Sequence, residues 1–331
     1  MKKLALFLAM ALLLAAVLPV GVFAASKTSG SFGELRWKLD KKGTLTVRGE
    51  GAMPDLGEGE RAPWYPLRAK IKKAVVKTGV TAIGASAFES CKKMKSVSLP
   101  ESLESIGEYA FSECGALKSA VIPEGVTELR KGAFFYCAAL ESVTLPGSVR
   151  TIGEKAFAWC DELLGAIIPE GVEVVGDDAF SGCHELRHAT IPSSVTRIGK
   201  RAFYECESLR SVTIPEGMTN IGDLAFYDCE NLADEDGFVI VNGILFDFYG
   251  DDIYPEIPEG VTTIGYQAFK YWDDLMCVTI PLSVTRIGDQ AFLGCHGLKE
   301  LRYAGSAEQW AAVEIGENAI PDGVTIRYKA E

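Results

Sequence analysis

Cysteines recur in this chain at a fixed interval of 23 residues, at Cys91, Cys114, Cys137, Cys160, Cys183, Cys206 and Cys229. A constant period of this length is typical of repeat proteins, in which each unit packs only on its neighbours. Aligning the chain to itself gives nine copies of the unit x-x-V-x-I-P-x-x-V-x-x-I-G-x-x-A-F-x-x-C-x-x-L. One such unit cannot bury its own apolar side, so the spacing predicts a solenoid of stacked coils.

Each slot of the unit has a physical interpretation. The V-x-I segment alternates apolar and polar residues, which predicts a short strand with one buried face, and the proline ends that strand. Glycine follows the Val-x-x-Ile segment in eight of nine copies, from Gly84 to Gly288, which indicates a corner that needs positive φ. Alanine and phenylalanine fill the next slots in all nine copies and predict a short helical or 3-10 turn.

Two slots predict ladders along the stack. We expect the phenylalanines to stack as a buried aromatic ladder: Phe88, Phe111, Phe134, Phe157, Phe180, Phe203, Phe226, Phe269 and Phe292. Eight cysteines, the seven above and Cys295, share one slot, and Trp272 fills it in the remaining copy. Adjacent coils bring Cα atoms within disulfide range, but stacked side chains point in parallel and the slot is apolar. A ladder of reduced thiols is therefore favoured over disulfides.

The two ends of the array and one internal segment depart from the repeat. Residues 25–70 predict a β-hairpin cap that turns around Asp40, with Trp64 available to cover the first coil. The repeats occupy residues 71–298, interrupted at 233–252, where Asn242-Gly243 predicts a hairpin. Residues 299–331 predict a second cap, because Ser306 and Gln309 have capping-box spacing for a short helix and a final strand follows.

The first 24 residues have the pattern of a secretory signal peptide. Lys2 and Lys3 precede an apolar run, and Val22-Phe23-Ala24 offers a small-residue cleavage site. The alternative is a membrane anchor, for which the run is borderline in length and is broken by Pro19. We therefore expect a secreted or cell-surface protein with no stable membrane insertion after cleavage.

The charge balance argues against several partners. Without residues 1–24 the chain has 31 Lys and Arg against 45 Asp and Glu, a net charge of −14, and it has no continuous basic block. Such a chain is a poor candidate for binding nucleic acid or anionic membranes.

The repeats resemble a known family. Units such as SVTIPEGMTNIGDLAFYDC and TRIGDQAFLGC are similar to the leucine-rich repeats of the bacterial surface protein A (BspA) type. The LRWKLDKKGTLTVRG, GFVIVNGILFDFY and YAGSAEQW segments resemble pieces that often accompany those repeats. The resemblance implies an α/β leucine-rich-repeat solenoid with short parallel strands on one side and short helical or 3-10 turns on the other. It also implies export and a role in attachment or protein binding, with no catalytic residues.

One short motif suggests a metalloprotease. His184, Glu185 and His188 spell H-E-x-x-H, which on a helix would place two imidazoles beside a zinc ion. In the repeat frame, however, His184 ends the Ala-Phe turn and His188 begins a strand, so the two do not share a helical turn. The third histidine, His296, is far away in sequence, and no helix carries Glu205 or Glu207 as a further ligand. We predict no metal, no cofactor and no enzyme activity.

Other catalytic patterns are equally weak. No G-x-S-x-G element or glycine-rich phosphate loop occurs in the sequence. Asp234-Glu235-Asp236-Gly237 lacks the full ligand series of a calcium loop, which favours a solvated acidic turn.

Two surfaces remain as candidate binding sites. Aromatic residues gather between the Phe and Cys slots and form a possible patch on the turn side: Phe135, Tyr136, Trp159, Tyr204, Tyr227 and Tyr271. The strand side is a ladder of Ser and Thr, to which Arg187, His188, Arg210 and Tyr254 give local character. Exposed aromatics can anchor a protein or sugar, although they can also simply cover the turns.

The sequence therefore predicts a secreted solenoid that binds a partner outside the cell. The first hypothesis is protein–protein interaction or adhesion. The second is carbohydrate binding, to host or cell-wall glycans. An exported hydrolase is the remote alternative, because the chain offers no catalytic constellation.

Overall fold

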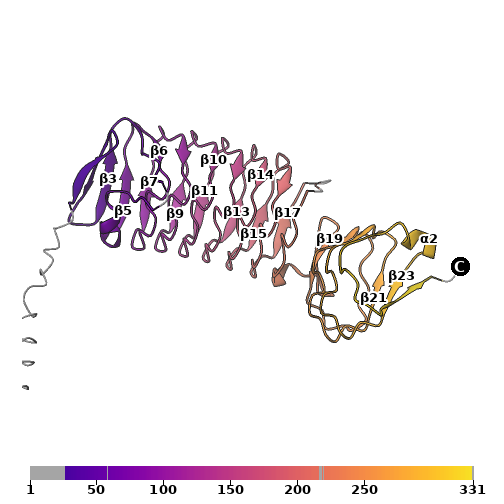
Figure 1. The fold of residues 1–331 in the computed structure, drawn as a ribbon. Helices are drawn as coiled ribbons and strands as arrows, with labels where there is room; N and C mark the ends of the chain where they lie inside the picture. The colour runs from indigo at the N-terminus through magenta and orange to yellow at the C-terminus, as the bar shows by residue number, and fades with distance from the viewer. Residues whose placement is uncertain (1–26, 58, 216–217, 219, 330–331) are drawn as a thin grey trace, which may run out of the picture.

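Each 23-residue unit folds into one coil with three sides, in a computed structural model that describes residues 27–57, 59–215, 218 and 220–329. The V-x-I segment forms a short strand, the segment before the glycine forms a two-residue strand, and the Ala-Phe segment forms a turn. Corresponding sides stack on one another, which gives the predicted solenoid (Figure 1). The predicted signal peptide lies outside the described residues.

The first side, which we call the strand face, is built from parallel pairs whose partners are 23 residues apart, such as Ser119 with Ser142 and Gly165 with His188. Its middle residue points inward, and its outer two point to solvent. The strands are β5 (Lys73–Val76), β7 (Ser96–Ser98), β9 (Ser119–Val121), β11 (Ser142–Thr144), β13 (Gly165–Ile167), β15 (His188–Thr190) and β17 (Ser211–Thr213).

The second side is one parallel sheet of seven strands, which begins at the cap. Its strands bury the isoleucine, leucine or valine of the repeat and leave the residue before it half-buried or exposed. They are β4 (Gly51–Ala52), β6 (Val80–Ile83), β8 (Ser105–Ile106), β10 (Glu128–Leu129), β12 (Thr151–Ile152), β14 (Val174–Val175) and β16 (Arg197–Ile198).

The third side, the turn face, is a run of turns with i to i+3 hydrogen bonds, such as that from Cys114 to Phe111, and contains very little helix. In all nine copies the residue before Ala and the residue before the Cys slot have positive φ, for example Lys155 at 57° and Trp159 at 61°. This alternation turns every second N–H toward the next coil, where Phe111 donates to Ala133 and Phe134 donates to Ala156, both at 2.8 Å. Alternate peptide groups therefore bond along the stack, and the others bond within their own turn.

The repeated glycine has a different role from the predicted one. None of the glycines that follow the two-residue strands has positive φ. A Cβ at Gly107 would lie 2.6 Å from the backbone nitrogen of Ala85, and one at Gly153 would lie 2.6 Å from the carbonyl oxygen of Leu129. Glycine is needed because two successive coils approach through their backbones at this corner.

The core contains the predicted aromatic ladder. From Phe88 to Phe226, successive phenylalanine rings are nearly parallel, with centroids 5.1 to 5.5 Å apart. Cysteines line the same interior as free, buried thiols. The Sγ of Cys137 donates to the carbonyl of Phe111 at 3.2 Å, and the same bond recurs from Cys114 to Cys229. Each thiol thus ties its coil to the preceding one.

The N-terminal cap closes the first coil. The antiparallel strands β1 (Ser29–Phe32), β2 (Leu35–Leu39) and β3 (Thr44–Arg48) continue the strand face, because β3 pairs in parallel with β5. The 3-10 helix η1 (Tyr65–Lys70) follows Trp64, whose ring is fully buried 5.8 Å from that of Phe88. The Trp64 indole donates to the carbonyl of Ala87 at 2.7 Å, which covers the first coil as the sequence predicts.

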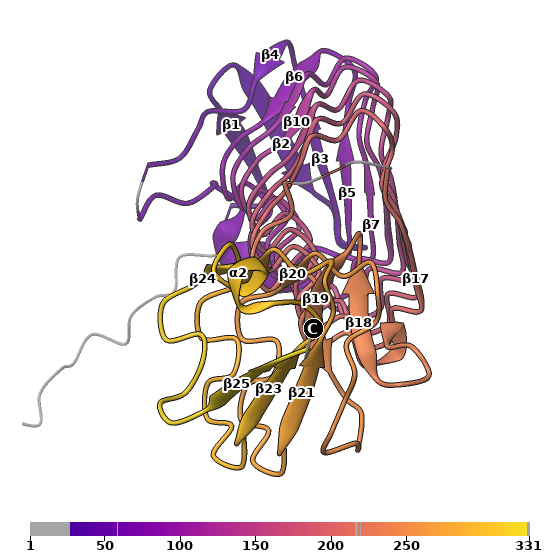
Figure 2. The same ribbon diagram turned by 90° about the vertical axis from the view of Figure 1, so that its right-hand side faces the viewer.

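The insert at residues 233–252 forms a hairpin that begins a second stack of coils. After η2 (Glu230–Leu232), the strands β18 (Phe238–Val241) and β19 (Ile244–Phe248) form a hairpin across Asn242 and Gly243. β19 pairs in parallel with β20 (Thr263–Ile264), so it starts the second stack of coils. Figures 1 and 2 show this stack displaced to one side of the first. Phe246 packs on Phe226 and Phe248 packs on Phe269, so the hairpin joins two cores.

The second stack ends in the C-terminal cap. On the second side of its coils, the sheet continues from β20 through β22 (Arg286–Ile287) and β24 (Glu314–Ile315). Its strand face contains β21 (Cys277–Ile280), β23 (Glu300–Tyr303) and β25 (Thr325–Tyr328). Ser306 and Gln309 form a capping box that opens α2 (Ala307–Trp310). Among the described residues, no helix is long and apolar enough to span a membrane.

Candidate functional site

The predicted aromatic patch of the turn face divides into separate groups. The ring centroids of Phe135 and Tyr136 are 6.2 Å apart, whereas Tyr204 stacks on Tyr227 at 5.7 Å, three coils further along. Tyr271 belongs to the second stack. The structure therefore does not gather the six residues into one patch.

Several of these rings cover the backbone of the next coil. A Cβ at Gly182 would lie 2.8 Å from the Trp159 ring, and one at Gly294 would lie 2.3 Å from the Tyr271 ring. Trp159 is 36% exposed and also lies 5.7 Å from His184. These contacts favour a covering role for the rings, because each aromatic side chain fills the space that a glycine leaves open.

The strand face brings together three of its four predicted residues. Arg187 precedes β15, His188 begins it, and Arg210 precedes β17 on the next coil. The His188 imidazole lies over Gly165, where a Cβ would be only 2.6 Å from Nε2. Tyr254 lies in the second stack, whose strands belong to a different sheet, so it does not join the other three.

Exposed aliphatic side chains are a further feature of the strand face, and they are not among the binding residues predicted from the sequence. Val121 and Ile167 are 67% and 72% exposed, in the slot that holds threonine on the neighbouring coils, and Leu164 is 42% exposed. Val121 also lines a groove of about 460 Å³ that crosses the coils of β7, β9 and β11. In the sequence, Val121 and Ile167 are visible as two interruptions in the Ser/Thr ladder of the strand side.

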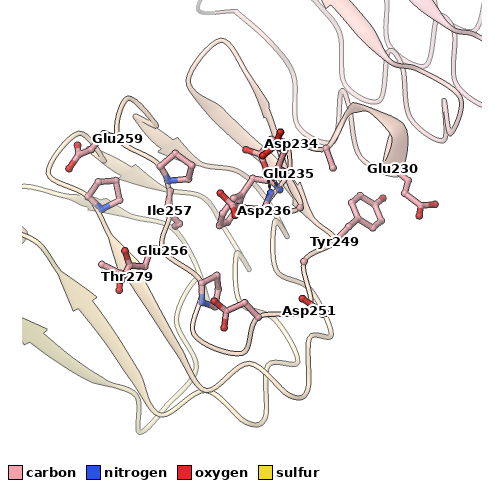
Figure 3. Close-up of a pocket in the computed structure, with 18 of the residues that line it drawn as sticks. Glu230, Asp234, Glu235, Asp236, Tyr249, Asp251, Glu256, Ile257, Glu259 and Thr279 are labelled. Atoms are coloured by element: carbon pink, nitrogen blue, oxygen red, sulfur yellow. Dashed lines mark hydrogen bonds between the residues drawn. The ribbon is translucent and has the colours of Figure 1, made fainter.

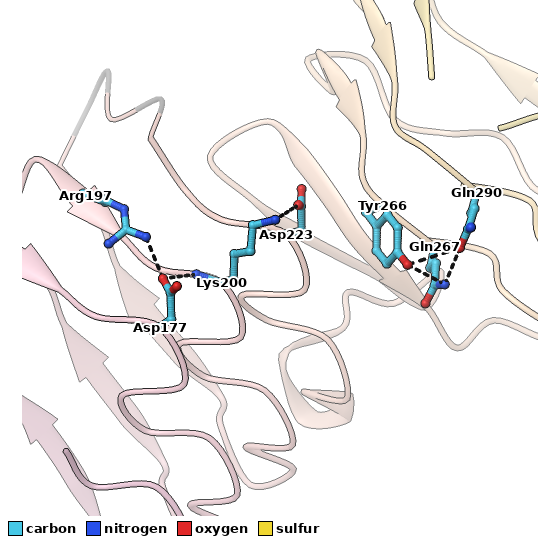
Figure 4. Close-up of polar contacts among 7 residues, drawn as sticks. All are labelled: Asp177, Arg197, Lys200, Asp223, Tyr266, Gln267 and Gln290. Atoms are coloured by element: carbon cyan, nitrogen blue, oxygen red, sulfur yellow. Dashed lines mark hydrogen bonds and ion pairs between the residues drawn. The ribbon is translucent and has the colours of Figure 1, made fainter. Parts of the chain in front are cut away.

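The second side of the coils carries polar contacts between neighbouring units. Asp177 accepts from the Arg197 guanidinium at 2.6 Å, and Lys200 pairs with Asp223 at 3.1 Å (Figure 4). In the second stack, Gln267 donates to Gln290 at 2.8 Å. The partners sit in adjacent coils, so these groups serve the stack rather than forming a cleft.

An acidic hollow lies where the two stacks meet. It has a volume of about 1120 Å³ and is lined mainly by residues between η2 and Glu259, with Thr279, Pro281 and Ala304 from later coils (Figure 3). Asp234 accepts from the N–H groups of Asp236 and Phe238, so its carboxylate holds the turn into β18. Its lining includes no Lys, Arg, His or Cys.

The H-E-x-x-H residues form no metal site. His184 lies in the turn face with its Nδ1 3.3 Å from Asp161, and His188 is on the strand face. Within the described part of the chain, no group of three or more His, Cys, Asp or Glu residues is arranged to hold a metal ion.

This architecture defines a leucine-rich-repeat solenoid with open faces. The BspA-type leucine-rich repeat region matches in six copies, over residues 67–187, 151–236 and 248–317. The chain therefore belongs to the BspA-type leucine-rich-repeat family. No curated protein matches the chain.

One solved structure supports the same fold, and others show a weaker similarity. A leucine-rich repeat protein from Eubacterium ventriosum is 22% identical, with a TM-score of 0.50, 92% of this chain covered and 97% of that one. The T. pallidum leucine-rich repeat protein is 25% identical, with a TM-score of 0.49 and coverage of 62% and 91%. A leucine rich cell surface protein from Faecalibacterium prausnitzii is 23% identical, with a TM-score of 0.35 and coverage of 87% and 98%.

Proposed function

We propose that this protein is an extracellular or cell-surface scaffold that binds another protein through the strand face of its first stack. The observation that carries the proposal is the pair of exposed aliphatic residues, Val121 in β9 and Ile167 in β13, on a strand face that otherwise presents mainly hydroxyl groups. Solvent-exposed apolar groups with polar surroundings are typical of binding surfaces. The proposal agrees with the family, whose members are typically surface-associated or extracellular.

The neighbouring charges suit a protein partner. Arg187 and Arg210 lie at the edge of the strand face, beside the coil that carries Ile167. Polar and charged groups around an apolar centre provide orientation and specificity, while the centre provides most of the affinity. The backbone beneath is held by a continuous parallel ladder from β13 to β17, so the surface is preformed.

The test is binding of residues 25–331 to purified matrix proteins, mucins and glycans at physiological salt. The double variant Val121→Thr with Ile167→Thr installs the residue that occupies this slot at Thr144, Thr190 and Thr213. The fold should be retained, and affinity for a bound protein should fall at least tenfold.

A matched control changes the turn face instead. The triple variant Phe135→Ala, Tyr136→Ala and Trp159→Ala should keep the affinity for that protein. If the triple variant loses binding while the threonine variant keeps it, the strand face is not the site. If no purified protein binds, and soluble sugars compete with the glycans that do, the result would favour the carbohydrate hypothesis.

A further inference from the structure

The cations of this chain are concentrated in its N-terminal part. Residues 27–95 contain 15 Lys and Arg against 7 Asp and Glu, a net charge of +8. Residues 96–331 contain 16 against 38, a net charge of −22. The overall acidic balance, which makes the chain a poor candidate for binding nucleic acid or anionic membranes, hides this asymmetry.

Folding places several of these cations on one surface. In β2 the side chains alternate, so that Trp37 is buried while Arg36 and Lys38 face solvent. Arg36 pairs across the sheet with Arg48 of β3. Val47 pairs with Val76 in β5, so Lys77 comes next to Arg48 on the same face. Arg36, Arg48 and Lys77 therefore form a row across three strands, which we call the cationic row.

The cationic row has no carboxylate partner. None of its three residues takes part in an ion pair with any residue of the described ranges. Neighbouring strands lie about 4.8 Å apart, and like charges directly opposite one another destabilise a sheet. An anionic ligand would relieve this repulsion.

The surface around the row is a groove with hydrogen-bond donors. It has a volume of about 920 Å³, and its lining includes the cationic row, Lys38 and the hydroxyl-bearing Ser29, Ser31 and Thr46. Ser29 lies opposite Lys38, and Ser31 lies opposite Arg36, so hydroxyls and cations alternate across the edge of the sheet.

A second group of cations lies at the opposite end of β5 from Lys77. Lys72, Lys95 and Lys118 occupy the same slot on successive coils, and their backbones are joined by the bonds from Lys95 to Lys72 and from Lys118 to Lys95. The series ends where Lys118 pairs with Glu141. The cations of the first coils are therefore a group separate from the cationic row.

The chemistry of this surface favours one class of partner. Among the described residues, every large apolar side chain that is exposed lies at Val121 or later, and Trp37, which lines the groove, is only 4% exposed, so the basic surface offers no protruding aromatic or aliphatic anchor. Protein interfaces and single-stranded nucleic-acid sites both rely on such anchors. We propose that the N-terminal sheet binds a linear polysaccharide that carries sulfate or carboxylate groups. This site is separate from the strand-face site proposed above.

The test measures binding of residues 25–331 to dextran sulfate at several salt concentrations, with neutral dextran as the matched probe. The variant Arg36→Gln, Arg48→Gln and Lys77→Gln should weaken binding at least tenfold and flatten its salt dependence, because counterion release scales with the cations engaged. The variant Lys270→Gln, Lys299→Gln and Lys329→Gln removes the same charge from the second stack and should change affinity less than about threefold.

Several results would overturn the proposal. One is that the cationic-row variant and the control variant weaken dextran sulfate binding equally. The others are that neutral dextran binds as tightly as dextran sulfate, or that dextran sulfate does not bind at all. Tighter binding of polyuridylate would assign the surface to nucleic acid. Self-association in the ultracentrifuge that the cationic-row variant abolishes, without polysaccharide binding, would assign it to a second copy. The Val121→Thr, Ile167→Thr variant should keep dextran sulfate binding, which separates this proposal from the strand-face one.

Discussion

At the scale of single residues, cysteine and phenylalanine hold successive coils together. The carbonyl of Phe111 accepts from the backbone N–H of Cys114 in its own coil and from the thiol of Cys137 in the next. A small apolar side chain with a donor suits this position, because the site is dry and the carbonyl has a second lone pair. The recurrence of cysteine in this slot therefore has a structural explanation that needs no disulfide or metal.

The ladder thiols should be chemically inert in the folded protein. Burial raises the pKa of Cys137 to about 12, and the thiolate is the reactive form. We expect none of the eight ladder cysteines to react with a thiol reagent at pH 8 until the protein is unfolded. Counting reacted thiols before and after adding denaturant measures this. Rapid labelling of the native protein, or fewer than nine thiols in unreduced denatured protein, would contradict it.

At the scale of elements, β19 contains an unusual polar cluster between the two stacks. Asp247 is buried and accepts from the N–H of Phe248 and from the Tyr249 hydroxyl, both at 2.9 Å. The same hydroxyl lies 3.1 Å from Asp228 of the last coil before η2. One hydroxyl proton cannot serve both carboxylates, so the cluster is most easily satisfied when one of the acids is protonated.

The junction should therefore lose stability as pH rises. Burial raises the pKa of Asp247 from 3.8 to about 6. Between those values the folded protein keeps a proton that the unfolded chain releases. The free energy of unfolding should fall by about 3 kcal/mol in this range and level off above pH 6. Asp247→Asn, which mimics the protonated acid, should remove this dependence. Denaturation at pH 4 to 7.5 checks it, and parallel profiles for both proteins would count against it.

The elements also show what the sequence could and could not predict. The stacked phenylalanines, the hairpin at Asn242 and the capping box at Ser306 follow from residue type and spacing alone. The turn-face conformation did not, because positive φ falls on residues as different as Lys155 and Trp159, and is imposed by hydrogen bonds to the next coil. The separation of Tyr254 from Arg187 could not be predicted either, since it depends on how β19 redirects the array.

At the scale of the whole molecule, the charge and the core are both divided. The cap and first coils are basic and the remainder is acidic, so the two proposed sites are different in chemistry. The buried residues form two clusters that meet at the hairpin. The parallel ladder on the second side of the coils is also interrupted. Among the described residues, it ends in the first stack at the bridge from Ile198 to Ile221, and it begins again at β19 in the second stack.

A solenoid is stabilised by contacts between neighbouring coils, so a break in the ladder should divide its unfolding into two transitions. Phe134→Ala removes a fully buried ring from the first stack and should lower that stack's stability by about 3 to 5 kcal/mol. Phe292→Ala should do the same in the second stack and leave the first unchanged. Calorimetry with hydrogen exchange distinguishes the transitions. A single transition that both variants shift equally would mean that the hairpin, through Phe246 and Phe248, couples the two cores as strongly as adjacent coils are coupled.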